Sequence, residues 1–593
     1  MNRQTYLAVS TDWSKMAYLD FESAYEKAPE TIVRGSHEAW SGWDEVLDGI
    51  GELASERDAR VVTVDVYPGV RDDVLDRLRE RLSPSLVVDM RELLPRQGDL
   101  DRMLAPFLTD DRVRGRMCYM TMEEFLDAEK LAEARTRVEA AEGRVLVYGV
   151  GAALVAPGEV LVCADLARWE AQLRYRAGMP NYFLDNADED MLRKVKCGFF
   201  VEWRVADRHK FDVLPRADLY LDTNGDVPAM TTVAALIDGL GQLARAPFRL
   251  VPYFDPGVWG GQWIREVCKL PSEAPNYAWA FDGVPEENSV YLRFGGVRIE
   301  SPAMNLTKLF PREFLGSKTF ARWGAECPIR FDFLDTMGGQ NLSLQVHPTT
   351  EYMHEHFGMA YTQDESYYIL DAEPCGGVYL GLKEGVDADE MVAALRDAQS
   401  GDKPFDVERY VNLWPAKRHD HFLIPAGTVH CSSAGTMVLE VSATPYIFTF
   451  KLWDWGRLGM DGKPRPIHID DGKRVIAWER TTDWVRKNLV NALVPVSEDE
   501  GCTVTHTGLH ELEPIETRAI DIRGTYHGNT NGELHVFNLV EGRSATVSSP
   551  TDAWEPREVH YAETVFVPAS AGAFDVTSTD GSPIRILEAA PRV

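Results

Sequence analysis

The chain has 593 residues and a formal net charge of −31, with 45% hydrophobic and 26% charged residues. This composition is typical of a soluble globular protein, and it excludes disorder, collagen and a coiled coil as the main architecture. At about 150 residues per domain, the length predicts three to four domains. A chain this acidic repels nucleic acids and anionic lipids, so we expect neither a nucleic-acid partner nor a membrane partner.

The N-terminal residues and the cysteines predict the cellular compartment. The first residues, MNRQTYLAVSTDWSKMAYLDFES, lack the apolar core of a signal peptide. No window approaches the length of an apolar transmembrane helix. The eight cysteines form no Cys-x-x-Cys pair, so neither a zinc ribbon nor a disulfide framework is predicted. We therefore expect a cytoplasmic protein.

Residues 1–245 alternate apolar runs with helical periodicity. The apolar, strand-like runs are 60–69, 85–90, 143–153 and 159–166, and the helical stretches are 71–82 and 122–141. Residues 185–211 are expected to form a helix followed by a strand. Alternating strands and helices predict an α/β layered domain with a largely parallel sheet.

One loop in this region has the outline of a nucleotide-binding motif. Residues 61–75 read as a strand, a glycine-containing turn and a helix, and they resemble a degenerate P-loop of a kinase. Arg71, Asp72 and Asp73 stand where a working P-loop has Gly, Lys and a hydroxyl residue. Two carboxylates there would repel phosphate, so the sequence favours an ordinary strand-to-helix turn. The alternative is a decayed kinase domain retained as a scaffold.

From about residue 250 the sequence changes to short strands separated by Gly and Pro turns, which predicts sandwiches or small barrels. One helical insert is expected at 387–401. A second, similar β-rich segment begins at about 485. The predicted fold class is therefore a multidomain α+β protein.

The strongest chemical signal is a set of nitrogen and oxygen ligands. Gln345 and His347 are two residues apart on a predicted strand, so their side chains share a face. Glu365 opens the next strand, and a Pro-x-Gly-x-x-His turn ends at His430. These residue types suit zinc or a similar divalent metal. Each residue alone is more typical of a polar group inside a barrel, but together they favour a metal site.

These motifs resemble the type I phosphomannose isomerases, which are zinc-dependent mannose-6-phosphate isomerases with a cupin fold. The resemblance covers residues 250–480. It rests on VWGG (258–261), NLSLQVHP (341–348), YLGLKEGV (379–386), IPAGTVH (424–430) and DWGRLGMDGKPRPIHI (454–469). It implies one Zn²⁺ per chain, bound by Gln345, His347, Glu365 and His430.

The charges that would handle the substrate depart from the family pattern. The family has a Lys in a run that ends in Leu-Asp, and Asp332 stands at that position here, with Arg330 nearby. The family's catalytic Arg aligns with Lys451, and Arg457 follows it. The resemblance therefore implies Lys451 and Arg457 as catalytic residues.

A basic stretch of residues surrounds these positions, because Lys463 and Arg465 follow within the same segment. A phosphosugar needs such cations, since Lys and Arg hold phosphate dianions. We expect Lys463 and Arg330 to bind substrate. The residues do not identify the catalytic base, and Glu440 and His421 both remain candidates.

We therefore predict three parts: an α/β domain of unknown role (1–245), a metal-binding cupin catalytic domain (246–484) and a C-terminal cupin-like β-domain (485–593). The resemblance implies interconversion of mannose 6-phosphate and fructose 6-phosphate. The alternatives are a non-catalytic sugar-phosphate sensor, an isomerase for a related phosphosugar, and a cupin oxygenase. Gln345 as a fourth ligand disfavours the oxygenase. The oligomeric state is left open.

Overall fold

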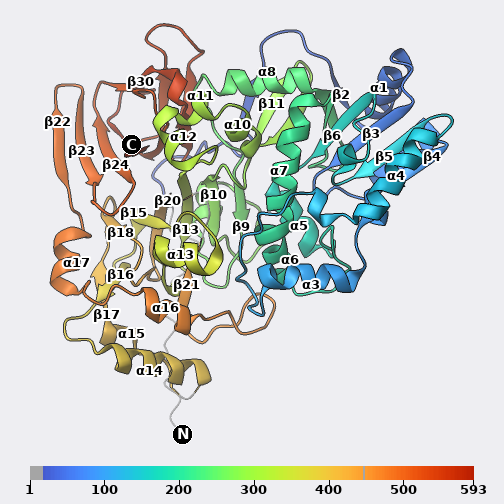
Figure 1. Cartoon of the computed structure of the whole chain (residues 1–593). Coiled ribbons are helices and arrows are strands. Elements are labelled where there is room, and N and C mark those ends of the chain that lie inside the picture. The colour runs from blue at the N-terminus through green and yellow to red at the C-terminus, as the bar shows by residue number, and fades with distance from the viewer. Residues whose placement is uncertain (1–17, 402, 445–447) are drawn as a thin grey trace.

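The N-terminal region is built on a seven-stranded sheet with the order β2-β8-β7-β6-β3-β5-β4 (Figure 1). The computed structural model describes residues 18–401, 403–444 and 448–593. The strands are β2 (Ala39–Ser41), β3 (Val61–Val66), β4 (Leu86–Asp89), β5 (Val145–Gly149), β6 (Val160–Asp165), β7 (Leu219–Asp222) and β8 (Ala229–Thr232). Strands β3 to β7 pair in parallel, and β8 and β2 continue the sheet antiparallel. All six residues of β3 are buried, as expected for the centre of a parallel sheet.

This arrangement confirms the predicted strands and the parallel sheet. The helices of the region are α1 (Trp43–Glu56), α2 (Asp73–Leu82), α3 (Gln97–Leu108), α4 (Ala128–Ala140), α5 (Arg168–Arg176), α6 (Met191–Cys197), α7 (Trp203–Val213) and α8 (Val233–Leu243). The prediction of a strand at the end of 185–211 was wrong. Residues 191–213 are continuously helical, with a π-helical turn at Gly198–Glu202. A short apolar run cannot distinguish a buried helix from a strand, and this run is buried on nearly every side.

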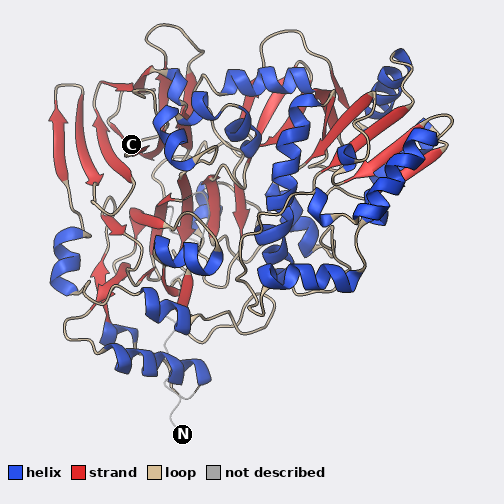
Figure 2. Ribbon diagram, in the orientation of Figure 1, coloured by secondary structure: helices blue, strands red, loops and turns tan. Residues whose placement is uncertain are grey.

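Two facing sheets form the β-rich centre of the chain (Figure 2). The six-stranded sheet has the order β18-β15-β20-β13-β10-β9, and the five-stranded sheet β17-β16-β19-β14-β21. The bounds of the first are β9 (Tyr253–Asp255), β10 (Trp279–Gly283), β13 (Ile329–Asp335), β15 (Asp364–Ala372), β18 (His421–Ile424) and β20 (Thr436–Ala443). Those of the second are β14 (Leu344–Val346), β16 (Gly377–Leu382), β17 (Val411–Pro415), β19 (His430–Ser432) and β21 (Phe450–Trp453). This pair is the cupin-like part of the mixed α/β structure.

The helices of residues 246–488 are mostly short. They are α9 (Trp263–Val267), α10 (Ala303–Leu309), α11 (Pro311–Leu315), α12 (Ser317–Trp323), α13 (Thr350–Phe357), α14 (Ala388–Ser400), α15 (Val407–Tyr410), α16 (Ile469–Val475) and α17 (Thr482–Asn488). The predicted helical insert is confirmed as α14, whose N-terminus is capped by Asp387 accepting from the backbone N–H of Glu390.

The C-terminal part contains a six-stranded sheet, β22-β23-β24-β31-β26-β29, and a four-stranded sheet, β25-β30-β27-β28. The strands are β22 (Val494–Glu498), β23 (Cys502–Gly508), β24 (Ile515–Ile522), β25 (Thr525–Asn529), β26 (His535–Glu541), β27 (Ser544–Ser548), β28 (Arg557–His560), β29 (Thr564–Val567), β30 (Ala573–Ser578) and β31 (Ile584–Pro591). The buried residues of the two sheets form a core of their own. The predicted boundary at 484/485 falls inside α17.

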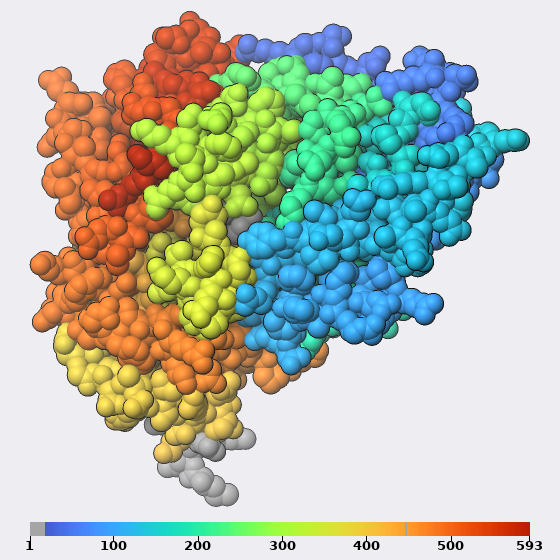
Figure 3. Space-filling model, in the orientation of Figure 1, coloured from blue at the N-terminus to red at the C-terminus, as the bar shows by residue number. Residues whose placement is uncertain are grey.

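The N-terminal region packs directly on the cupin part. Strand β1 (Glu30–Ile32) pairs in parallel with β11 (Ser289–Phe294), which also pairs with β12 (Val297–Pro302). The backbone N–H of Met117 donates to the carbonyl of Phe357 at 2.8 Å, and Figure 3 shows the corresponding blue and yellow segments meeting along one continuous surface. Among the described residues, no helix has the length and apolar character needed to span a membrane.

Candidate metal centre and its surroundings

Three predicted ligands converge between the two cupin sheets. The Nε2 atom of His430 lies 2.7 Å from Oε1 of Glu365, and Nε2 of His347 lies 3.1 Å from Oε2 of the same carboxylate. His430 opens β19, His347 follows β14, and Glu365 lies near the start of β15 on the facing sheet. All three side chains are buried, and one ligand atom from each lies within 4.8 Å of the others.

The backbone orients both imidazoles toward this point. The Nδ1–H of His347 donates to the carbonyl of Phe448 at 2.9 Å, and the Nδ1–H of His430 donates to the carbonyl of Thr428 at 2.9 Å. Each hydrogen bond fixes the tautomer and leaves Nε2 as the ligand atom. Gly427 adopts a φ of 90°, and its N–H donates to the carbonyl of His347 at 2.9 Å. The glycine turn therefore ties the two histidine segments together.

The chemistry of this donor set fits a divalent metal. Nε2 of His347, Nε2 of His430 and Oε1 of Glu365 are buried and lack a hydrogen-bond partner among the described residues. Buried polar atoms without partners are costly, and their convergence is explained by a cation that would take all three as ligands.

Gln345 and Lys451 lie on the same face as these ligands. Gln345 is directly opposite His430 on one side and Lys451 on the other. Opposed residues in antiparallel strands share a face of the sheet. The structure therefore brings Gln345 beside the metal cluster, with Lys451 as its neighbour. Burial, and then the positive charge of Arg465, lower the pKa of Lys451 to about 7.

Two further carboxyls face the cluster from the six-stranded sheet. Asp332 on β13 is directly opposite Glu440 on β20. The amide of Gln363 donates to Oε2 of Glu365 at 2.9 Å and to Oε1 of Glu440 at 3.2 Å. Burial and the neighbouring Glu365 raise the pKa of Asp332 to about 7. Burial, and then Asp332, raise the pKa of Glu440 well above its ordinary value.

The two candidate bases left open by the sequence lie on opposite faces of the sheet. Glu440 is opposite Tyr367, two residues after the ligand Glu365, and so lies on the metal-facing side. His421 is opposite Tyr368 and lies on the other face. Burial lowers the pKa of His421 to about 3. Of these two, only Glu440 lies on the metal-facing side.

The basic stretch after β21 divides into an inner and an outer group. Arg457 and Arg465 both pair with Asp454, and Nη1 of Arg457 also donates to the carbonyl of Asn341 at 2.7 Å. Lys463 is exposed and donates to Asp190 of the N-terminal region at 2.6 Å. The structure thus places Lys451 beside the metal ligands and Lys463 at the contact between the two regions.

Arg330 occupies the interior face of β13. It is directly opposite Ser442, which is opposite Glu365, so the three residues lie in one row across β13, β20 and β15. Arg330 is only 2% exposed, and none of its guanidinium nitrogens has a hydrogen-bond partner among the described residues. Within the described ranges, the carboxylate nearest to this guanidinium is that of Glu286, at 3.7 Å.

Residues of the N-terminal region also reach this site, which the sequence did not predict. The guanidinium of Arg114 lies 4.4 Å from the ring centroid of Phe448 and donates to the carbonyl of Thr449. Phe448 is the residue whose carbonyl orients His347. Arg168 and Arg204 pair with Glu286. Arg204 lies in the segment that was wrongly predicted to be a strand. Recognising this segment as a helix was the one sequence signal that could have indicated the position of Arg204.

Two residues of the loop that resembles a P-loop form ion pairs with nearby residues of the same region. Arg71 binds Asp226 at 2.7 Å, and Asp72 binds Arg91 at 2.9 Å. In open α/β sheets, ligands bind beyond the carboxyl ends of the strands. Here that space is occupied by α7, where His209 pairs with Asp65 at 2.8 Å and Lys210 with Asp165 at 3.2 Å.

Comparisons with known proteins give one family model and several similar isomerases. Residues 42–245 match a family model described as a domain of unknown function (DUF8485). The chain is similar to mannose-6-phosphate isomerase ManA of Bacillus subtilis (strain 168), with 27% identity over 233 residues that cover 39% of this chain and 68% of that protein. It is 28% identical to mannose-6-phosphate isomerase of Streptococcus mutans over 225 residues, which cover 37% of this chain and 64% of that protein.

The solved mannose 6-phosphate isomerase of Bacillus subtilis aligns with 58% of this chain and 99% of its own length, with 19% identity and a TM-score of 0.48. In the two sequence matches, this chain aligns with 64% to 68% of the length of the curated relatives. The sequence matches confirm the resemblance of this chain to the phosphomannose isomerases.

Proposed function

We propose that the chain is a metal-dependent aldose–ketose isomerase that interconverts mannose 6-phosphate and fructose 6-phosphate. The observation that carries the proposal is the convergence of His347, Glu365 and His430, with both Nε2 atoms free of hydrogen bonds. The similarity to two proteins named mannose-6-phosphate isomerase supports the choice of reaction. A cytoplasmic location stays a prediction.

Zinc is the metal we propose, at one ion per chain, with His347, Glu365, His430 and Gln345 as ligands. Imidazole nitrogen, carboxylate oxygen and amide oxygen are suitable zinc ligands, and the fixed tautomers present the correct nitrogen. When bound, such a metal stabilises negative charge on sugar oxygens during the reaction.

Isomerisation moves a proton between C1 and C2 of the sugar, so it needs a group that accepts and returns a proton. Glu440 and Asp332 are opposed carboxyls on the metal-facing side of their strands. We assign proton transfer to this pair, because carboxyls positioned in a site serve as general acids and bases. Lys451, beside Gln345, supplies positive charge next to the ligands. Arg457 supports Asp454 rather than the sugar.

The N-terminal region is proposed to act as a scaffold. Its P-loop-like turn is closed by ion pairs, and α7 fills the space beyond the strands. The division into 1–245, 246–484 and 485–593 follows the change from the parallel sheet to the two β-rich parts. We place catalysis in the second.

A sugar-phosphate sensor remains the second candidate, because Asp332 stands where the family resemblance implies a Lys. The test is a coupled assay of the purified full-length chain with mannose 6-phosphate, with and without added zinc. Zinc-dependent formation of fructose 6-phosphate supports the isomerase. Tight binding of mannose 6-phosphate by the zinc-loaded chain, with no turnover on a panel of aldose and ketose phosphates, supports the sensor instead.

A further inference from the structure

Phe448 is a junction in the hydrogen bonding around the metal ligands. Its carbonyl accepts from Nδ1–H of His347 at 2.9 Å, and its backbone N–H donates to Oε1 of Gln363 at 2.9 Å. The amide of Gln363 in turn donates to Oε2 of Glu365 at 2.9 Å and to Oε1 of Glu440 at 3.2 Å. The backbone of one residue therefore orients a histidine ligand directly and a carboxylate ligand through one amide.

The position of this backbone depends on the aromatic ring of Phe448. Phe448 lies just before β21, whose pairing with β14 begins at Phe450. Both polar groups of its backbone are bound to side chains rather than to a neighbouring strand. The ring packs on Phe357 of the cupin part, with centroids 4.5 Å apart. Because the strand ladder begins after Phe448, the contacts of its ring fix where its carbonyl points.

The N-terminal region supplies two more of the groups that contact this ring. The guanidinium of Arg114 lies 4.4 Å from the ring centroid of Phe448, and the ring of Phe200 packs edge-on at 6.5 Å. Arg114 also donates to the carbonyl of Thr449, the next residue. A cation over the aromatic face and a charge-assisted hydrogen bond to the adjoining carbonyl hold Phe448 at two points.

Arg114 is itself held in place by Asp111. Oδ1 of Asp111 accepts from the backbone N–H of Val113 at 2.7 Å and from that of Arg114 at 2.6 Å. Its Oδ2 lies 3.1 Å from Nε2 of His468, whose backbone N–H donates to the carbonyl of Lys451 at 2.8 Å. The loop between α3 and α4 is thus attached to β21, and the position of Arg114 is fixed relative to that strand.

We propose that Arg114 is a positioning residue of the metal centre, through which the N-terminal region orients His347 and Glu365. This inference deepens the proposed function and rests on its metal site. A hydrogen bond to the far side of a metal ligand fixes its tautomer and orientation, and its loss typically weakens metal binding about 10- to 100-fold. Arg114 holds the residue that makes this hydrogen bond, so its loss should fall at the lower end of that range.

The test measures the zinc affinity of the full-length chain by competition with a chromophoric chelator. The visible spectrum of the cobalt-loaded chain reports the geometry of the ligands. The test variants are Arg114→Met and Phe200→Leu, and Arg114→Lys is the conservative variant. Arg112→Met is the matched control, because Arg112 lies on the same loop and binds the cupin part through Asp461. Circular dichroism establishes that each variant is folded.

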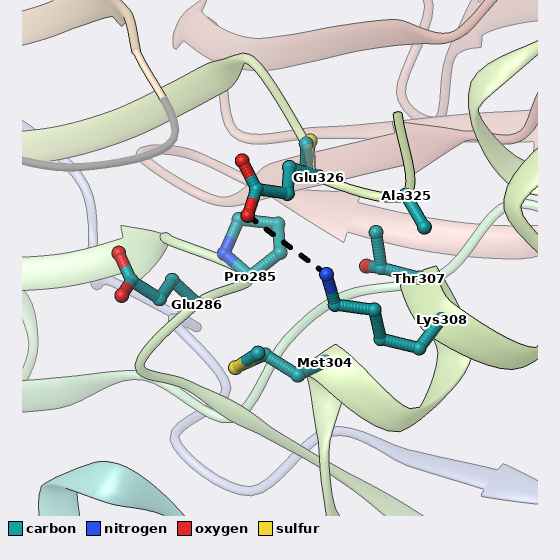
Figure 4. Close-up of a pocket in the computed structure, with 8 residues that line it drawn as sticks. Pro285, Glu286, Met304, Thr307, Lys308, Ala325 and Glu326 are labelled. Atoms are coloured by element: carbon teal, nitrogen blue, oxygen red, sulfur yellow. Dashed lines mark ion pairs between the residues drawn. The ribbon is translucent and has the colours of Figure 1, made fainter. Parts of the chain in front are cut away.

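Lys308→Met controls for a general effect of the interface between the two regions. Figure 4 shows Lys308 pointing toward Glu326, and their charged groups lie 3.8 Å apart. Both residues line a cavity together with Arg208 of α7, so they too lie where the regions meet. Among the described residues, Lys308 takes no part in the hydrogen bonds around Phe448.

We expect Arg114→Met to weaken zinc binding about tenfold and to change the cobalt spectrum. Phe200→Leu should weaken zinc binding in the same direction. Arg114→Lys should recover part of the affinity, because lysine keeps the cation and a donor but not the planar fork. The two control variants should match the wild type. A residue that only stabilises the fold would lower the melting temperature and leave the zinc affinity and the spectrum unchanged.

Wild-type zinc affinity in a folded Arg114→Met variant overturns the proposal. If Arg114→Met does not fold, Phe200→Leu decides the question, because it keeps an apolar side chain at a buried position. Wild-type zinc affinity in Phe200→Leu then overturns the proposal in the same way.

The readouts separate this inference from the proposed function. A zinc affinity that depends on Arg114, in a wild-type chain that does not isomerise mannose 6-phosphate, supports the positioning role and contradicts the isomerase. Isomerase activity of the wild type, together with unchanged zinc affinity in Arg114→Met, supports the isomerase and contradicts the positioning role. A wild-type chain that binds no zinc contradicts the metal site and with it this inference.

Discussion

At the scale of single residues, the metal centre depends on which nitrogen each histidine presents. Backbone carbonyls hold Nδ1 of His347 and of His430, so Nε2 of each ring faces Glu365. These three side chains were predictable from sequence, because period-two spacing and a glycine turn are local signals. Arg114 and Arg204 were not, because they come from segments far away in the chain, and local patterns carry no information about such contacts.

Removing the imidazoles should remove the metal. We expect His347→Ala and His430→Ala to lose most of the bound zinc, since each deletes one of a small number of ligands. Elemental analysis of the purified chains measures this directly. His421→Ala is the matched control, because His421 is buried on the opposite face of the sheet. Full zinc retention in the double variant of His347 and His430 would exclude the assigned site.

Deprotonation of Lys451 should lower the activity at alkaline pH. Its pKa is lowered to about 7, so the ammonium loses its proton as the pH rises through that value. If the charge is needed, kcat/KM of the wild type falls above about pH 7. Lys451→Arg should move this fall to higher pH, because arginine stays protonated.

Replacing Lys451 by the neutral residue Met tests whether the reaction needs the positive charge of Lys451. Lys451→Met should lose about 10²–10³ in kcat, as is typical when a contact made in the transition state is deleted. Its zinc content should equal that of the wild type, because Lys451 is not a ligand. Near-normal rates in Lys451→Met would show that another cation serves this role.

At the scale of elements, strand register assembles the site and one helix fills the space where a nucleotide would bind. The register of β14 places Gln345 between His430 and Lys451. In the N-terminal sheet, α7 places His209 on Asp65 and Lys210 on Asp165. The alternation of strands and helices predicted this sheet correctly. The helical state of 198–203 was not predictable from periodicity alone, because a short, largely apolar run does not distinguish a buried helix from a strand.

We expect the N-terminal sheet to neither bind nor hydrolyse ATP. Asp72 and Asp73 replace the residues that hold phosphate and magnesium, and Arg71 and Asp72 are engaged in ion pairs. Calorimetry with ATP and magnesium, together with a phosphate-release assay, checks this. Micromolar binding with turnover would contradict the scaffold role.

At the scale of the whole molecule, the N-terminal region and the cupin part share an interface of aromatic and charged residues. Trp169 stacks on Tyr253 with ring centroids 4.0 Å apart, and Phe200 packs edge-on against Phe448 at 6.5 Å. Arg114 adds its contact with Phe448, beside a metal ligand. The sequence predicted separate regions, but it did not predict that one would help to support the site of the other.

Deleting residues 1–245 should therefore harm the rest of the chain. The remaining 246–593 fragment would expose Tyr253 and Phe448 and lose β1 from its sheet. We expect this fragment to aggregate or to unfold at a lower temperature than the full chain, as measured by size-exclusion chromatography and thermal unfolding. A monomeric fragment with unchanged melting temperature and zinc content would contradict the shared interface.

The central claim is that this chain isomerises mannose 6-phosphate with a metal held by His347, Glu365 and His430. The most direct test is to strip the full-length chain of metal and add zinc stepwise while measuring conversion of mannose 6-phosphate to fructose 6-phosphate. We predict activity that rises in proportion to zinc and saturates at about one ion per chain, as a single four-ligand site requires, and that does not return in His430→Ala. Activity that survives complete metal removal, or that His430→Ala retains in full, would contradict the account.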